Sequence, residues 1–163
     1  MSVERIFLAA GSGETQVEVD RVNVTAETGI EGDRYFGAKD EPGQNITLVE
    51  AEEIEAFFAE AGRPGDLSCT RRNIVTRGVR LNELVGKEFT IGGVRARGVE
   101  LCEPCRGLGS RLASTELSTA EAVKRFVHRA GLRADILSSG SIAVGSKVAV
   151  VAESFYSSRQ SAA

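Results

Sequence analysis

The chain has 163 residues, the length of one ordinary globular domain. Its residues are 42% hydrophobic and 26% charged, proportions that exclude a wholly disordered or fibrous protein. No apolar run approaches the roughly 20 residues that cross a bilayer, and the first residues lack a basic leader before an apolar stretch. Three cysteines, an odd number, build no even disulfide framework, so we expect a cytoplasmic protein without membrane contact.

The net charge of −3 is distributed unevenly along the chain. Residues 1–66 contain five Lys or Arg and fifteen Asp or Glu, a balance of −10. Residues 71–111 contain eight arginines and Lys87 against four glutamates, a balance of +5. An arginine-rich segment inside an acidic protein indicates a local anion site. A nucleic-acid partner is not favoured, because aromatic residues for base stacking make up only 6% of the chain.

Hydrophobic periodicity predicts a mainly β chain with two or three inserted helices. Strands are expected at 3–10, 17–24 with an irregularity near Asp20, 45–49, 73–76, 88–91, 94–101, 132–137 and 147–151. Helices are expected after residue 50, over 105–112, and from Ser118, which forms a capping box with Glu121. The buried stripe of this last helix is expected to be Val123, Phe126, Val127 and Ala130. We therefore predict one domain over residues 1–152, a closed antiparallel β-barrel, and a frayed tail over 153–163.

Several common site chemistries find little support in the sequence. Residues 11–14 have the glycines of a phosphate loop but lack its later Gly-Lys-Ser/Thr. His128 is the only histidine and lies off the apolar stripe of its predicted helix, so a Ser-His-Asp triad is not favoured. A zinc site at Cys102 and Cys105 would have only Cys69 and His128 to complete it, which makes zinc a weak candidate.

Cys102-Glu103-Pro104-Cys105 is the sharpest local feature of the sequence. Two half-buried structural thiols and a thioredoxin-like dithiol are both open alternatives. Cys102 continues the apolar pattern of a strand, so we expect its thiol to be buried and protonated. Cys105 follows Pro104 at the expected start of a short helix and stands next to Arg106. The helix dipole and a guanidinium both favour a thiolate, the form that acts as nucleophile or soft metal ligand.

Four segments together resemble the MOSC domain, a family named for the C-terminal domain of molybdenum cofactor sulfurase. In chain order they are Gly29-Ile30-Glu31-Gly32-Asp33-Arg34, residues 71–78 with 82–86, Leu101-Cys102-Glu103-Pro104-Cys105, and residues 131–134 before the turn at Gly140. Each segment alone is weakly specific. Their common order along most of the chain is specific.

The resemblance implies a barrel similar to the β-barrel domain of pyruvate kinase, built around one reactive cysteine, which falls on Cys105. In one role this cysteine carries sulfur as a persulfide, taken from a pyridoxal-phosphate cysteine desulfurase and passed to a molybdoenzyme. In the other it ligates the molybdenum of a pterin cofactor in reductases of N-hydroxylated compounds. The match places cofactor-binding residues at Gly32, Asp33, Arg34, Arg71, Arg72, Asn73, Thr76 and Arg133.

This chain departs from the reductase pattern at several points. Tyr35 stands where many relatives have histidine, and Arg72 stands where the reductases often have proline. The chain also lacks an iron–sulfur cysteine set, so a reductase would need an external electron donor. We therefore expect a MOSC protein that binds molybdenum cofactor or carries sulfur for it. The reductase and a thiol–disulfide protein using Cys102 and Cys105 remain the alternatives.

Overall fold

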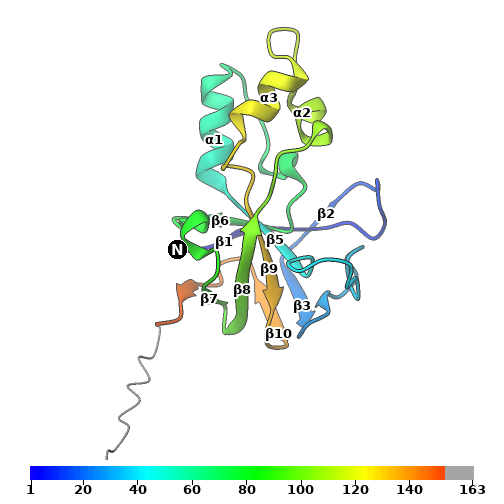
Figure 1. The fold of residues 1–163 in the computed structure, drawn as a ribbon, viewed down its shortest axis with the longest axis vertical. Coiled ribbons are helices and arrows are strands. Elements are labelled where there is room, and N and C mark those ends of the chain that lie inside the picture. Colours follow the sequence, from blue (N-terminus) through cyan, green and yellow to red (C-terminus); the bar gives the residue numbers. More distant parts are fainter. Residues whose placement is uncertain (153–163) are drawn as a thin grey trace, which may run out of the picture.

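The structure is a computed structural model that describes residues 1–152; the predicted tail over 153–163 lies outside the described residues. Within that range the chain forms eleven strands, three α-helices and two short 3-10 helices. The strands curl into a half-barrel, and the three helices gather at one end of it (Figure 1). None of the helices between residues 1 and 152 has both the length and the apolar character needed to span a membrane.

An eight-stranded sheet forms most of the half-barrel. Its order is β11 (Val148–Val150), β7 (Glu88–Ile91), β8 (Val94–Leu101), β9 (Leu132–Ile136), β5 (Ile46–Glu50), β6 (Ile74–Arg77), β1 (Ser2–Leu8) and β2 (Val17–Val19). A second sheet has the order β10 (Gly140–Ala143), β3 (Arg21–Thr25) and β4 (Gly29–Ile30). The prediction of a mainly β chain with inserted helices is confirmed, and the irregularity near Asp20 is the break between β2 and β3.

The prediction of a closed antiparallel barrel is wrong in two respects. Over the described residues no ladder joins the two edge strands, β11 and β2. On the second edge of β1, β2 pairs with Ile6, Phe7 and Leu8. Residues 1–3 of that edge meet residues 145–148 through three backbone hydrogen bonds and an isolated bridge between Ser2 and Lys147, which do not extend into a ladder with β11. In addition, β5 and β6 pair in parallel, because α1 (Ala51–Glu60) carries the chain back between them. The result is an open half-barrel, and a likeness to the pyruvate kinase barrel is not shown.

Two hydrophobic clusters stabilise the fold: a barrel core inside the curled sheet and a helix core beneath the helices. Side chains of a strand alternate between its two faces, so β5 sends Ile46 and Leu48 into the barrel core and Val49 into the helix core. Strands β1 and β6 divide their side chains in the same way. In the helix core the rings of Phe57 and Phe126 pack with centroids 4.9 Å apart.

Helix α2 (Arg106–Leu112) starts one residue later than the sequence predicts. Cys105 has an extended backbone (φ −103°, ψ 169°) and is the N-cap, so Pro104 lies outside the helix. Leu108 and Leu112 point into the helix core and fix α2 against the helix end of the molecule. This arrangement leaves the Cys105 side chain at the exposed start of a helix that is held firmly by its apolar face.

Helix α3 (Thr119–Arg125) begins at the predicted cap, where the Ser118 hydroxyl accepts a hydrogen bond from the backbone N–H of Glu121. It ends earlier than predicted. His128 is exposed and has a left-handed backbone (φ 61°), which a continuous helix does not allow. As a consequence the predicted stripe is only partly correct: Val127 is 43% exposed, while Phe126 is fully buried.

Candidate functional site

A cavity of about 340 Å³ is lined by five segments that lie far apart in the sequence. They are residues 34–35, 41–47, 71–73 and 100–103 together with Arg133. Five of the positions predicted from the sequence line this cavity: Arg34, Arg71, Arg72, Asn73 and Arg133. The fold therefore brings the predicted arginines to one place, although up to 99 residues separate them along the chain.

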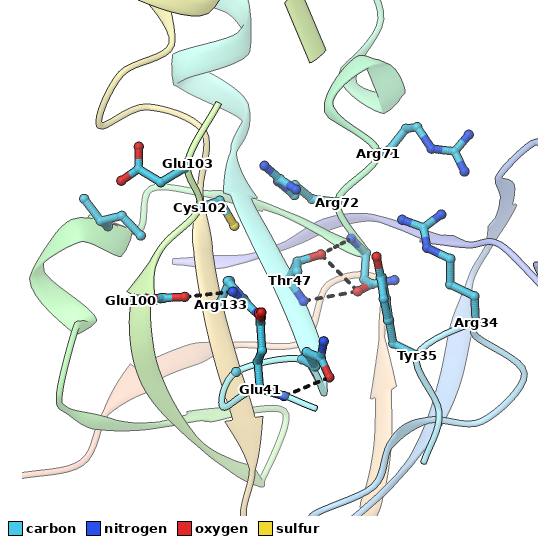
Figure 2. A pocket seen from close by; sticks show the side chains of 14 residues that line it. Arg34, Tyr35, Glu41, Thr47, Arg71, Arg72, Glu100, Cys102, Glu103 and Arg133 are labelled. Carbon is cyan, nitrogen blue, oxygen red and sulfur yellow. Dashed lines mark hydrogen bonds and ion pairs between the residues drawn. The ribbon is translucent and has the colours of Figure 1, made fainter. Parts of the chain in front are cut away.

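Three arginines form one side of the cavity, which we call the arginine wall: Arg34, Arg71 and Arg72 (Figure 2). None of them makes an ion pair with a carboxylate of residues 1–152. The Arg34 guanidinium stacks over the Tyr35 ring at 4.9 Å, and Arg72 Nε donates to the carbonyl of Ala130 at 3.0 Å. These contacts orient the guanidinium groups without neutralising them, which makes the wall an attractive surface for an anion.

Arg71 is held in a backbone conformation that few residues adopt. Its φ of 59° lies in the left-handed region, which costs a residue with a side chain roughly 1–2 kcal/mol. The Arg71 N–H donates to the carbonyl of Ser68 at 3.0 Å, and the Gln16 side chain donates to the Arg71 carbonyl at 3.0 Å. The Arg71 guanidinium itself donates to the carbonyl of Glu14 at 2.6 Å. Strain of this kind clusters at functional sites, and here it belongs to a side chain that lines the cavity.

Buried polar side chains join four chain segments next to the arginine wall, around Ala9, Asp33, Thr47 and Asn73; we call this group the Asp33–Asn73 joint. The Asp33 carboxylate accepts hydrogen bonds from the backbone N–H groups of Ala9 and Tyr35 and from the Asn73 amide. The side-chain amide oxygen of Asn73 (Oδ1) accepts from the backbone N–H and the hydroxyl of Thr47, at 3.1 and 3.0 Å. Both side chains are buried and use their polar atoms inside the protein. They position two arginines of the wall: Arg34, which follows Asp33 in the chain, and Arg72, which precedes Asn73.

A second cluster lies across the cavity from the arginine wall (Figure 2). Arg133 Nη1 pairs with Glu100 at 2.8 Å, and Arg133 Nη2 pairs with Glu41 at 3.0 Å. Sequence reasoning missed both glutamates. Glu100 is the cross-strand partner of Arg133 in the β8–β9 ladder, so a correct strand register would have found it. Glu41 lies in a loop and left no signal in the sequence.

Cys105 is exposed, and the pKa of its thiol is lowered. The first cause is the nearby backbone N–H of Leu108 in the opening turn of α2, followed by that of Gly107, although the side chain makes no capping hydrogen bond in this structure. The positive charges of Arg111 and Arg72 lower the pKa further. The sequence pointed to Arg106 as the neighbouring cation, but the cations with the largest effect on this pKa are Arg111 and Arg72. Arg72 thus contributes in two ways: it lines the cavity, and its positive charge lowers the pKa of the Cys105 thiol.

The other two thiols have the opposite character. Cys102 is 4% exposed and lines the cavity, and burial raises the pKa of its thiol, as the strand pattern led us to expect. Burial also raises the pKa of Cys69, to about 11. All three cysteines are free. Cys105 is therefore the one cysteine of this chain whose surroundings favour a thiolate, although it is not among the residues that line the cavity.

The remaining predicted positions lie away from the cavity surface. Gly32 has a φ of 84° in the turn before Asp33, a conformation that glycine adopts without strain. Thr76 is fully buried in β6, where its hydroxyl donates to the carbonyl of Val49 at 3.3 Å. Among the described side chains no group of three or more His, Cys, Asp and Glu gathers as a metal cage.

Solved structures share this fold. The YuaD protein from Bacillus subtilis superposes with a TM-score of 0.78 at 19% identity, covering 91% of this chain and 93% of that chain. YiiM from Geobacillus stearothermophilus has a TM-score of 0.71 at 16% identity, covering 93% and 75%. YiiM from Escherichia coli has a TM-score of 0.68 at 16% identity, covering 93% and 70%. At such identities the likeness shows a common fold. No curated protein sequence matches the chain.

Fold and site together define a small, open β half-barrel with an arginine-lined cavity and a low-pKa cysteine at a helix start. The sequence model of the MOSC domain matches residues 33–149, more than half of the chain, so the chain belongs to the MOSC domain family. The match confirms the resemblance to the MOSC domain that four sequence segments indicated. Membership of this family is consistent with a function connected to molybdenum cofactor.

Proposed function

We propose that this MOSC protein binds an anionic molybdenum–pterin cofactor at the arginine wall and uses Cys105 as a metal ligand or persulfide carrier. One observation carries the proposal: Arg72 lines the cavity and also lowers the pKa of the Cys105 thiol. An arginine in that position stabilises a negative charge on the ligand and on the sulfur together. The anion site and the thiolate can therefore act on one molecule.

The donor chemistry of the site fits such a cofactor. The three guanidinium groups of the arginine wall have no carboxylate partner within residues 1–152. Arg71 and Arg72 each give one donor nitrogen to a backbone carbonyl, and the remaining donors are available to a phosphate. A thiolate at Cys105 is a soft ligand of the kind that sulfur-binding metals take. When bound, the cofactor supplies the redox chemistry of the metal. The chain's residues hold its phosphate and offer one sulfur ligand.

As a sulfur carrier, Cys105 would react with a persulfide on a donor protein, expected to be a pyridoxal-phosphate cysteine desulfurase. The Cys105 thiolate attacks the outer sulfur of that persulfide. A new S–S bond forms at Cys105, the donor's S–S bond breaks, and the donor cysteine leaves as a thiolate with the electron pair. The lowered pKa supplies the attacking thiolate, and the exposure of Cys105 gives the donor access. The acceptor of the sulfur would be a molybdoenzyme.

The test compares the wild type with Cys105→Ser, Cys102→Ser and Cys69→Ser, each purified from a host that makes molybdenum cofactor. Molybdenum and pterin are measured by mass spectrometry, and persulfide is measured by labelling after incubation with a cysteine desulfurase. Cys105→Ser should lose metal retention and persulfide formation, while the other two variants keep most of both. Greater damage from Cys102→Ser would overturn the proposal. Equal loss in Cys102→Ser and Cys105→Ser would favour the thiol–disulfide alternative.

A further inference from the structure

The loop before β5 runs along the cavity as a strap, residues 38–44. One tie to the sheet is at Gly43, whose N–H donates to the Asp135 carboxylate at 2.7 Å. Gly43 also lies so close to β8 and β9 that an added Cβ would meet the Cβ atoms of Arg133 and Val99 at 3.0 and 3.1 Å. This end of the strap is fixed by backbone contact. Two residues earlier, Glu41 makes a tie of another kind.

Glu41 holds the strap through a side chain that the cavity shares. Its carboxylate pairs with Arg133 Nη2 at 3.0 Å, while Glu100 takes Nη1 of the same guanidinium at 2.8 Å. The Arg133 side chain is 23% exposed and lines the cavity, but the Glu41 side chain is 62% exposed. Arg133 is therefore a fourth cavity arginine whose charge is occupied by two carboxylates of the protein itself.

We propose that Glu41 competes with anionic ligands for Arg133. An anionic ligand that enters the cavity takes the Nη2 edge of Arg133 from Glu41 and thereby releases the strap. Glu41 thus sets how much negative charge a ligand must bring to recruit Arg133. The inference rests on the anion-binding part of the proposed function. It adds a residue that regulates access and selects among ligands at the same cavity.

The backbone setting favours exchange at Glu41 over exchange at Glu100. Both carboxylates are mostly exposed, Glu41 by 62% and Glu100 by 56%, so both ion pairs are weak, because water screens them and ordering the side chains costs entropy. A contact between guanidinium and phosphate is charge-assisted and two-pronged. Glu100 lies directly across from Arg133 in the β8–β9 ladder, so the sheet holds it in place, and it uses the other guanidinium nitrogen. Glu41 lies on a loop that can move away.

The experiment titrates the protein with inorganic phosphate and follows two readouts. Calorimetry gives the Kd for phosphate, and amide hydrogen exchange gives the exchange rate of the strap. Wild type is compared with Glu41→Gln, and Glu100→Gln is the matched control: it removes a carboxylate from the same guanidinium but leaves the strap tie in place.

In the wild type, phosphate should speed exchange in the strap. In Glu41→Gln, exchange should already be fast without phosphate and should not rise further, and the Kd should tighten roughly two- to fivefold, the range of an exposed ion pair. Glu100→Gln should keep the phosphate-dependent rise. The inference is overturned if phosphate binds but slows or does not change strap exchange in the wild type, or if Glu41→Gln exchanges as slowly as the wild type. If phosphate does not bind at all, the arginine wall is not an anion site, and the anion-binding part of the proposed function falls with the inference.

Discussion

At pH 8, iodoacetamide should label Cys105 well before Cys69. The pKa of Cys69 is about 11, so about one Cys69 thiol in a thousand is a thiolate at that pH. The pKa of Cys105 lies below the ordinary value of 9.0, so more than about one in ten is a thiolate. The more basic thiolate is intrinsically more reactive, with a Brønsted slope of about 0.4–0.5, which reduces the roughly hundredfold difference in thiolate to at least about tenfold in rate.

A matched pair of variants tests the source of this reactivity. Arg111→Ala removes a cation that lowers the pKa of Cys105, so the labelling rate at pH 8 should fall about 1.5- to 5-fold, the range for a partly exposed charge pair. The loss of a cation raises the pKa of the thiol, so the two proteins should differ at low pH and converge well above the pKa. Arg106→Ala removes a charge that is not among the main causes of the Cys105 shift and should change the rate less than Arg111→Ala does.

The assay is mass spectrometry of the labelled peptides over pH 6 to about 10, which follows each cysteine separately. Circular dichroism checks that both arginine variants remain folded. Labelling of Cys69 or Cys102 as fast as that of Cys105 would refute the reasoning. A larger effect from Arg106→Ala than from Arg111→Ala would show that the cation was assigned wrongly.

Three further predictions concern the arginine wall and the joint beside it. Arg34→Ala should weaken binding of a phosphate-bearing pterin by about 1.5–3 kcal/mol in calorimetry, whereas Arg97→Ala, which removes an arginine paired with Glu88 away from the cavity, should not. Asp33→Ala should lower the free energy of unfolding in urea by about 1–3 kcal/mol because its buried donors lose their acceptor; a loss below about 0.5 kcal/mol, typical of a surface change, would argue against the joint. Arg71→Gly should relieve the left-handed backbone strain, so the free energy of unfolding in urea should stay equal or rise. The same change should weaken pterin binding; unchanged binding would show that Arg71 does not contact the ligand.

Local patterns in the sequence were sufficient for most elements of the fold. Period-two alternation located the strands, and the Ser118 capping box located the start of α3. The sequence did not reveal whether the sheet closes, because closure depends on which distant edges meet. Here β2 pairs with one end of β1, and only residues 1–3 at the other end meet residues 145–148, so the contact between β1 and β11 does not become a ladder. Helix ends were also misplaced where one residue, His128, adopts a left-handed backbone.

For the candidate site, the sequence predicted residue types better than their contacts. Motif spacing led to the arginines that line the cavity, but it could not show that Asp33 spends its carboxylate on backbone N–H groups. Proximity in sequence also suggested Arg106 as the partner of Cys105, whereas the helix turns Arg111 toward the thiol instead. Such assignments depend on side-chain direction along a helix, which spacing alone does not give.

The two hydrophobic cores have a consequence for the motions of the site. Cys105 precedes a helix anchored in the helix core, while Arg133 lies on a strand whose neighbours fill the barrel core. Separately packed clusters tend to open as distinct cooperative units, and here β1, β5 and β6 form the seam between them. The spacing between the thiol and the cavity is thus set by the seam. A packing change at Phe57 in the helix core should therefore be felt first at α2 and Cys105, and it reaches the cavity only through Cys102, which belongs to the helix core, and through Arg72, which donates to the carbonyl of Ala130 in the same core.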